Sequence, residues 1–454
     1  MKKYIRAFIV FFIASLLFRI VISSFGNHPD IFSNAHWGEW IYFNGPKMFY
    51  LNNIWIYEWP TQLPIINLIY AVNFMIFLKL VSIFSLIGKA LSSFNLAPSI
   101  FKYFFSFIDW FAWQNFETTP LKNGFLMTMK LIPILADMAV AFFIKSIGKK
   151  VGREKLGVFL AAVFLIMPCS WYLSALWGQY DQVASLLLVL AFYLLASLMF
   201  SMVGWRRRLI LMLLSFFLCT LSIQIKPTGL FFIPMFFVLY LMLKPSIVEM
   251  FSTSFLFISL NCFSALAFSP DERPIFKFMS EVVAPKIFFE KRFLLSNQAF
   301  NLWQGLGTLV SLQIDGIWVK MVVFVIVFIL TVLALWVFIR NKQIKMFWIA
   351  LYILMAGNYL FNIGMMNRYF YTPIVVMGVL SLYYPKIVKY WVLTLIIFTF
   401  NLYYSWGYPM AVGIWDVFWK SKFWIFVLSF GNVMIYFLTL KETGCFKHVK
   451  KKNN

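Results

Sequence analysis

The residues of this chain that could carry out chemistry are polar groups at the edges of long apolar runs. Asp30 stands just after the first apolar run, and Glu58 stands just before the next one. A carboxylate in a partly desolvated pocket at a membrane surface can have a raised pKa and act as a general base. A structural role for Asp30 is equally open, because "PDIFSN" is also a favourable start for a helix.

A second polar group opens the apolar run "SALWGQYDQVASLLLVLAFYLL" at residues 174–195. An ionisable side chain at the centre of a membrane span costs roughly 2.5–3.5 kcal/mol on insertion scales, and much less at an edge that faces water. We therefore expect Gln179, Tyr180 and Asp181 to face an aqueous pocket from a helix end. The alternative is a helix cap with Trp177 as an anchor at the membrane interface.

Two cations lie at comparable edges. Lys226 stands at a turn between two apolar runs, before a proline, and Arg368 is followed by Tyr369 at the entry to a later run. A lysine at an outer turn runs against the positive-inside preference, so we expect it to pair with an acid such as Asp181 or with an anionic head group. The planar fork of arginine suits phosphate. Snorkelling toward ordinary lipid head groups is the alternative for both cations.

The segment 269–318 contains amides beside an indole, at Asn297, Asn301 and Trp303. Such side chains suit sugar hydroxyls and sugar faces, although they also make ordinary loop contacts. The sequence lacks the motifs GxxxxGK[ST], GxGxxG, DxD, HExxH and GxSxG. Its three histidines and four scattered cysteines have no metal-ligand spacing. We therefore expect no metal, no cofactor and no disulfide bond.

The elements that position these residues follow from composition. Of the 454 residues, 62% are hydrophobic and only 12% are charged, whereas about a quarter is charged in a soluble domain. Apolar runs of about 20 residues recur along the chain, a length that crosses a bilayer. The sequence thus predicts an all-α polytopic transmembrane helical bundle in the cell membrane, with 1–454 as a single integral-membrane domain. The start of the chain is expected to be a retained first helix and not a cleaved signal peptide.

The net charge of +23 is distributed as topology signals. Lysines and arginines gather in short clusters between apolar runs, at 2–6, 149–155, 206–208, 340–345 and 447–452. The positive-inside rule places these clusters, and with them both termini, in the cytoplasm. Membrane lipid is therefore expected as a partner, and nucleic acid is not.

This orientation places two long stretches on the outer side, 26–64 as a first, catalytic loop and 269–318 as a second. Both are expected to form interfacial helices over the mouth of a cavity. The segment 65–115 must cross the membrane an even number of times. Two crossings give 14 spans, which we favour, and an interfacial excursion gives 12.

The motifs, in their order, resemble the GT-C class of integral-membrane glycosyltransferases. The resemblance is strongest to bacterial relatives of the mannosyltransferase that adds the second mannose of GPI anchors. It covers about residues 26–385. The stretches that carry it are "PDIFSNAHWGEW", "YEWPTQLP", "KLIPILADMAVAF", "ALWGQYDQVASLLLVLAFYLL", "IKPTGLFFIP", "SNQAFNLWQGLG" and "NRYFYTP".

This resemblance implies a GT-C-like fold and an inverting, metal-independent sugar transfer on the outer face of the membrane. The donor would be a sugar linked through phosphate to a polyprenol, and the acceptor a glycan, a lipid or a protein. Mannose is the favoured sugar, with glucose, galactose and the pentose arabinose left open. Many relatives carry His-Glu where this chain has Met366-Asn367, which puts the donor or acceptor preference in doubt.

The resemblance also implies roles for single residues. Asp30 matches the catalytic base, and Glu58 matches a second loop acid. Arg368, Lys226 and Tyr369 would bind the donor phosphate. The remaining candidates would contact the sugar or the acceptor, and they are Gln179, Tyr180, Asp181, Asn297, Asn301 and Trp303.

Other functions stay open. A flippase or transporter of lipid-linked sugars would fit the composition, but such proteins often contain internal repeats, and none is visible here. A glycan polymerase or ligase would use an oligosaccharide on a lipid diphosphate. A subunit without catalytic activity would fit if the departures at Met366 and Asn367 mark decay.

Overall fold

The structure is a computed structural model that describes residues 2–52, 55, 56, 58–92, 106, 111, 115, 116, 119–270, 273–285, 296–309, 317–407 and 421–445. The elements of the first half are α1 (Lys2–Ile22), α2 (Pro29–Asn44), η1 (Phe49–Leu51), α3 (Pro64–Ser92), β1 (Asn115–Phe116), β2 (Thr119–Lys122), α5 (Asn123–Lys150), α6 (Glu154–Ile166), α7 (Pro168–Trp171), η2 (Tyr172–Trp177) and α8 (Asp181–Met199). Those of the second half are α9 (Trp205–Ile225), η3 (Pro227–Phe232), α10 (Ile233–Met242), α11 (Ile247–Phe268), α12 (Ile275–Phe278), η4 (Met279–Val283), β3 (Ser296–Asn297), α13 (Leu302–Gly307), α14 (Ile317–Asn341), α15 (Ile344–Phe361), β4 (Met365–Met366), η6 (Asn367–Phe370), α16 (Tyr371–Tyr383), η7 (Pro385–Ile387), α17 (Val388–Trp406) and α19 (Lys422–Thr443).

Helices dominate this structure because the long apolar runs satisfy their backbone hydrogen bonds internally. Within the described ranges, nine helices are long and apolar enough to cross a membrane. These are α3, α5, α8, α9, α11, α14, α15, α17 with η7, and α19. A tenth span is possible if α6 and the α7–η2 segment, which meet at a 57° bend, are one broken span. The predicted all-α bundle is thus confirmed.

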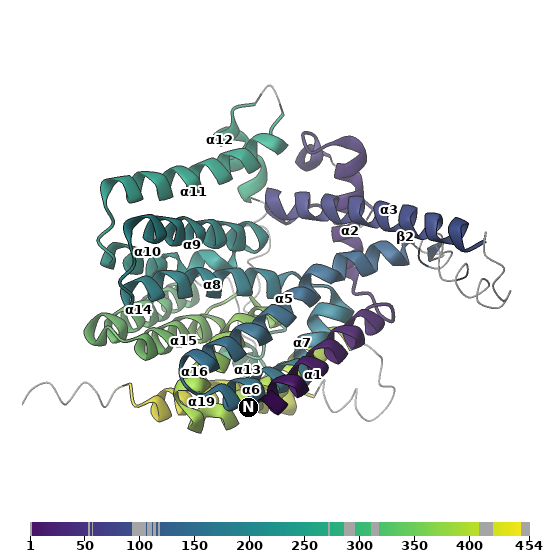
Figure 1. Ribbon diagram of the computed structural model, residues 1–454. Coiled ribbons are helices and arrows are strands. Elements are labelled where there is room, and N and C mark those ends of the chain that lie inside the picture. Colours follow the sequence, from purple (N-terminus) through teal and green to yellow (C-terminus); the bar gives the residue numbers. More distant parts are fainter. Residues whose placement is uncertain are drawn as a thin grey trace, which may run out of the picture.

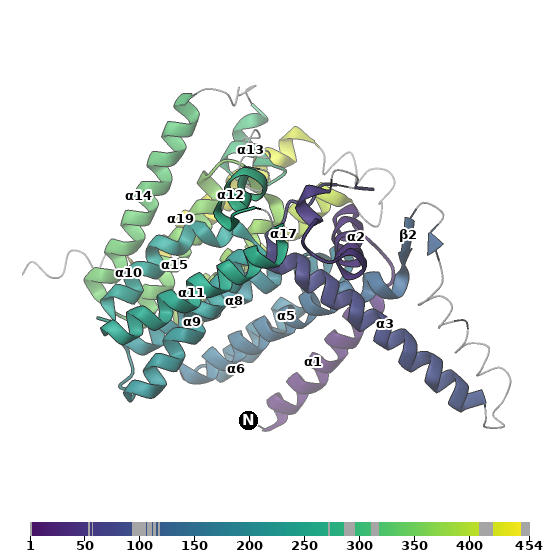
Figure 2. The same cartoon turned by 90° about the horizontal axis from the view of Figure 1, so that it is seen from above.

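The predicted number of 12 to 14 spans stays a prediction. The 29 residues of α3 form one unbroken helix, so a second crossing before α5 would have to follow Ser92. Residues 93–105 and 107–110 of that segment lie outside the described residues. Figure 2 shows the C-terminal half of α3 projecting beyond the other described helices.

The bundle is built from neighbouring helices that pack in pairs. The most extensive contacts join α8 to α9, α5 to α6, α14 to α15, and α2 to α3. Figure 1 shows α11, α9 and α8 as a stack of nearly parallel helices. The interior of the bundle contains α15, which is buried at every position from 346 to 361. A helix that is apolar all round and buried on every side belongs in the core.

Both predicted loop segments contain short helices. Segment 26–64 carries α2 and η1, and the described parts of segment 269–318 carry α12, η4 and α13. The position of these helices at a membrane surface stays a prediction. Residues 271, 272, 286–295 and 310–316 of the second segment lie outside the described residues.

A buried ionic cluster ties α1, α5, α7 and α16 together. Arg19 lies 3.8 Å from Asp137 and donates a hydrogen bond of 2.8 Å to Ser170. The Tyr371 hydroxyl donates to Asp137 at 2.5 Å. All four side chains are buried, and buried charges persist in an apolar interior when they are paired and hydrogen-bonded. Because Tyr371 begins α16, the cluster fixes the point where η6 enters that helix.

A second buried cation holds the start of the first loop. Lys130 of α5 is fully buried, and its Nζ donates to the backbone oxygens of Ser23 and Gly26. These carbonyls follow the last turn of α1, where backbone oxygens lack intrahelical partners. Lys130 therefore anchors the chain just ahead of α2, which carries Asp30.

Candidate active site

Asp30 lies in the first turn of α2, and the helix cap is the preceding histidine. The backbone N–H of Asp30 donates to His28 Nδ1 at 3.1 Å, and Pro29 occupies the first helical position. A carboxylate in a first turn is favoured by the helix dipole. Because His28 does the capping, the Asp30 carboxylate is left to face the rest of the site.

Two residues from distant parts of the chain meet the Asp30 carboxylate at the same oxygen. The Gln179 amide donates to Asp30 Oδ2 at 2.6 Å, and Arg368 Nη1 lies 3.1 Å from that oxygen. The three side chains come from α2, from the turn before α8 and from η6. The structure thus brings together residues that the sequence analysis had selected separately.

The WGQYD turn directs Gln179 toward Asp30. Gly178 ends η2 with a φ of 76°, a left-handed conformation that glycine adopts without steric cost. Before it, the Trp177 ring packs on the His28 ring with centroids 4.2 Å apart. The same indole lies 5.7 Å from the Arg368 guanidinium carbon, in a cation–π arrangement. The turn therefore directs Gln179 toward Asp30 and Trp177 toward Arg368.

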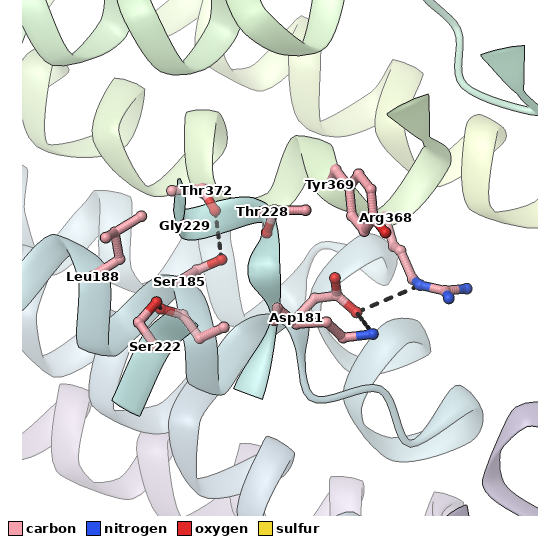
Figure 3. Close-up of a pocket in the computed structure, with 11 residues that line it drawn as sticks. Asp181, Ser185, Leu188, Ser222, Thr228, Gly229, Arg368, Tyr369 and Thr372 are labelled. Atoms are coloured by element: carbon pink, nitrogen blue, oxygen red, sulfur yellow. Dashed lines mark hydrogen bonds and ion pairs between the residues drawn. The ribbon is translucent and has the colours of Figure 1, made fainter. Parts of the chain in front are cut away.

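Asp181 sits between two cations on the other side of Arg368. Its Oδ2 lies 3.7 Å from Lys226 Nζ and 3.6 Å from Arg368 Nε (Figure 3). The predicted pairing of Lys226 with Asp181 is confirmed. Two acids and two cations thus alternate in the order Asp30, Arg368, Asp181, Lys226. Arg368 is the shared member, since separate nitrogens face the two carboxylates.

The pKa values outside the spans follow from this network. Burial alone would raise the pKa of Asp30, but the positive charge of Arg368 holds it well below its ordinary range. Burial lowers the pKa of Lys226, and Asp181 partly offsets that effect. Burial also opposes the charge of Arg368, but the two acids raise its pKa above the ordinary value. The His28 pKa is lowered by burial, which suits a neutral ring whose Nδ1 accepts from the Asp30 amide.

An open polar cavity of about 310 Å³, called the outer pocket below, contains the Asp30 carboxylate in its wall. Glu58, Gln179, Asn297 and Arg368 also line it. The sequence analysis did not assign its other lining residues to a site, and these are His28, Ser33, Asn34, Trp37, Thr61, Gln62, Trp177, Gln298, Met366, Asn367 and Ser405. Most of these offer hydrogen-bonding groups.

A second cavity of about 10 Å³, called the inner pocket below, lies on the Asp181 side of Arg368 (Figure 3). It is lined by Asp181, Ala184, Ser185, Leu188, Ser222, Lys226, Thr228, Gly229, Arg368, Tyr369 and Thr372. The sequence analysis missed its hydroxyls. The sequence does indicate Ser185, because this residue follows Asp181 by four positions and therefore shares its helix face.

Three predicted contacts to sugar lie elsewhere. The Tyr180 hydroxyl donates to Met129 O and accepts from Asn73, so this ring points into the protein. Asn301 caps α13, and Trp303 donates to Phe361 O at 2.9 Å. These side chains line neither pocket, because their polar atoms are bonded inside the fold. Their assignment as sugar contacts gains no support from this geometry.

No group of three or more histidine, cysteine, aspartate or glutamate side chains in the described part of the chain is arranged to hold a metal ion. The charged network itself offers three kinds of chemistry. It can accept a proton at Asp30, bind an anion at Arg368 and Lys226, and hydrogen-bond a polyhydroxy ligand in the outer pocket.

Substitution of Gly178 by alanine should disturb the site more than the same change at Gly152. Both glycines have a positive φ, 76° and 74°, so an alanine costs roughly 1–2 kcal/mol at either position. A Cβ at Gly178 would also lie 2.5 Å from the Ile31 side chain, next to Asp30, whereas one at Gly152 meets nothing within 4 Å. We expect a larger loss of thermal stability in G178A than in G152A, and a loss of site function in G178A alone. Equal function in the two variants would contradict the positioning role of this turn.

The low pKa of Asp30 predicts a specific dependence of stability on pH. A carboxyl group whose pKa is lower in the folded state stabilises the fold above its unfolded pKa of about 3.9, and this stabilisation is lost as the pH falls toward the folded value. The difference in thermal midpoint between wild type and D30N should therefore be constant from about pH 5 to pH 8 and shrink in more acidic buffer. A difference that grows on acidification would contradict the ion pair.

The sequence was compared with known proteins to see whether relatives support these roles. No model of a known protein family matches it, and no curated protein is significantly similar to it. The resemblance to GT-C glycosyltransferases therefore stays a prediction, and the case for a function depends on the geometry of the two pockets.

Proposed function

We propose that this protein is an inverting glycosyltransferase that moves a hexose from a polyprenyl-phosphate sugar to a glycan, lipid or protein acceptor at the outer face of the cell membrane. The observation that carries the proposal is the 3.1 Å contact between Asp30 and Arg368 in the wall of the outer pocket. One of these groups can take a proton from an acceptor, and the other can hold a phosphate that leaves.

The outer pocket suits a sugar. Its volume is at the lower end of the range for small-molecule sites, and its wall combines amides, hydroxyls and two indoles. Asn367 lines it, and the buried side-chain nitrogen of this residue has no hydrogen-bond partner among the described residues. A buried amide without a partner is costly, and a sugar hydroxyl would satisfy it.

The mechanism would be a single in-line displacement. Asp30 takes the proton of the acceptor hydroxyl while that oxygen attacks the anomeric carbon. The bond from this carbon to the phosphate oxygen breaks, its electron pair stays on the polyprenyl phosphate, and the anomeric configuration inverts. Asp30 loses its negative charge as the phosphate gains one.

Arg368 suits this transfer of charge because it contacts the carboxylate that takes the proton and can also contact the phosphate that leaves. Its Nη1 contacts Asp30, and its side chain lines both pockets. A fixed cation placed where charge develops contributes to catalysis without reorganising at the moment of reaction. The low pKa of Asp30 keeps the carboxylate ionised before the donor binds, so it begins in the form that can accept a proton.

Transport of the lipid-linked sugar is the second candidate. Transporters often contain interrupted helices near their substrate sites, and the break between α6 and α7 is such an interruption. The polar groups of the candidate site nevertheless gather around cavities that meet at one side chain, Arg368. This arrangement favours a reaction at a fixed position over movement across the bundle.

A transfer assay in liposomes tests the proposal. The purified protein would be offered a panel of polyprenyl-phosphate sugars with total lipid extract as acceptor, in the presence and absence of a metal chelator. Transfer from one donor, insensitive to chelation, is the expected result. Movement of lipid-linked sugar across the bilayer without transfer would favour a flippase, and use of a lipid diphosphate oligosaccharide would favour a polymerase or ligase.

A further inference from the structure

The Asp181 carboxylate occupies an unusual position for an acid in an apolar bundle. Its side chain is only 5% exposed, and its Oδ2 lies within 4 Å of both Lys226 and Arg368. That oxygen accepts no hydrogen bond from the described residues. It therefore acts through charge alone, at distances longer than a direct hydrogen bond.

The surroundings of this carboxylate are those of an anion site. The buried Lys226 and the mostly buried Arg368 face it, and the hydroxyls of Ser185, Thr228 and Thr372 line the same inner pocket. The first turn of the 19-residue α8 adds backbone N–H groups and the positive end of a helix dipole. Among the described residues, Asp181 is the only acid in the wall of this pocket.

The free space is too small for a second anion. A cavity of about 10 Å³ holds one water molecule at most. Any larger anion that reaches both cations must therefore move the Asp181 side chain aside. A phosphate group offers more acceptor oxygens than a carboxylate, and it can engage the arginine fork, the ammonium group and the nearby hydroxyls together.

We infer that the inner pocket is a phosphate site and that Asp181 is its resident counter-anion, which an arriving phosphate displaces from Lys226 and Arg368. The identification of this phosphate with the head group of a polyprenyl-phosphate donor or product rests on the proposed function. The site itself is defined by the two cations and the carboxylate between them.

This arrangement has a consequence for product release. The donor phosphodiester carries one negative charge, whereas the polyprenyl phosphate that leaves carries up to two near neutral pH. Two cations without a counter-anion would hold the product more tightly than the donor. The return of Asp181 to its place between the cations offsets that preference and assists dissociation.

Binding measurements on Asp181→Asn test the inference directly. The intact protein would be placed in phosphatidylcholine nanodiscs and titrated by calorimetry with a polyprenyl monophosphate and, separately, with inorganic phosphate. Removal of the negative charge that competes with the phosphate for Lys226 and Arg368 should tighten binding at least tenfold. Tighter binding of both ligands would show recognition of the phosphate group alone, and tighter binding of the lipid only would show a lipid head-group site.

The control is Glu154→Gln, which removes the same charge from the first turn of α6, outside both pockets. Its affinities should match those of the wild type. Asp181→Asn with unchanged or weaker affinity would overturn the inference. If that variant fails to fold, Lys226→Gln serves instead, since loss of one cation should weaken phosphate binding about tenfold, and an unchanged affinity would overturn the inference equally.

The outcome is separable from the proposed function because these titrations contain no sugar donor and need no turnover. Tighter phosphate binding in Asp181→Asn together with no sugar transfer by the wild type would refute the glycosyltransferase alone. Transfer activity with no change in phosphate affinity would refute the counter-anion alone.

Discussion

Asp30→Asn should lower the rate of sugar transfer by about 10²–10⁴-fold, the usual contribution of a general base. Asparagine has nearly the same shape as aspartate, so the first turn of α2 and the backbone hydrogen bond to His28 should persist. The variant loses only the negative charge that accepts the proton. The measurement is kcat at saturating donor and acceptor with protein in liposomes.

Glu58→Gln is the matched comparison, because Glu58 is the other acid in the outer pocket that the sequence analysis assigned to catalysis. It contacts the site from the segment before α3 and is not paired with Arg368 in the described network. We expect a smaller loss of rate in this variant. Near-normal turnover in D30N would exclude Asp30 as the base, and a larger loss in E58Q would transfer that role to Glu58.

The charged pairs were the most predictable part of the site. A lysine at an apparent outer turn, such as Lys226, violates the positive-inside preference and therefore needs a partner. Asp181 was the nearest acid at a comparable membrane edge, and the structure pairs the two at 3.7 Å. Arg368 and Asp30 were each selected by type and position, but their direct contact at 3.1 Å depends on tertiary packing that the sequence does not encode locally.

The direction of a side chain within a turn was the least predictable part. Gln179, Tyr180 and Asp181 are consecutive, yet the first lines the outer pocket, the second points into the protein and the third lines the inner pocket. The left-handed Gly178 starts this divergence, and a single glycine in the sequence does not reveal its φ. Residue type alone suggested sugar contacts for Asn301 and Trp303, which instead stabilise α13 and the end of α15.

The fold followed from apolar length more directly than the site did. The long runs became helices, and the interruption of one run at Pro168 became the 57° bend between α6 and the α7–η2 segment. Proline disfavours helical continuation at the residue before it, so a break here was within reach of the sequence. The division of the polar region into two pockets could not be predicted from the sequence, since it depends on one long side chain, Arg368, that lines both.

This shared position also couples the two ends of the reaction. In the described structure, Arg368 holds Asp30 and thereby lowers the pKa of its carboxyl group. A phosphate that binds in the inner pocket would interact with the same guanidinium group and weaken its attraction to Asp30. The basicity of Asp30 would then rise when the donor is present, which favours proton removal at the moment when an acceptor can be used.

Arg368→Ala should therefore be the most damaging single change at this site. It leaves Asp30 and Asp181 without their common counter-charge, although Lys226 remains 3.7 Å from Asp181. Removal of one member of a fully buried ion pair typically costs about 3–5 kcal/mol of stability, and we expect a smaller loss here because Asp30 is partly exposed. It also removes the fixed cation for the growing phosphate charge, an effect comparable to the loss of an oxyanion donor at about 10²–10³-fold in kcat. We expect a lower thermal midpoint, a weaker affinity for the lipid donor and a loss of rate of the same order as that of D30N.

Arg368→Lys separates charge from geometry. Lysine keeps the positive charge, but its single ammonium group cannot face Asp30 and Asp181 with separate nitrogens as Nη1 and Nε do. Its thermal midpoint should lie close to that of the wild type while its transfer rate stays reduced. Donor affinity measured by calorimetry shows whether Arg368 binds the donor or acts only on the stability of the fold. An affinity in Arg368→Ala equal to that of the wild type would remove Arg368 from the donor site, because a cation that binds the donor phosphate cannot be lost without weakening that contact.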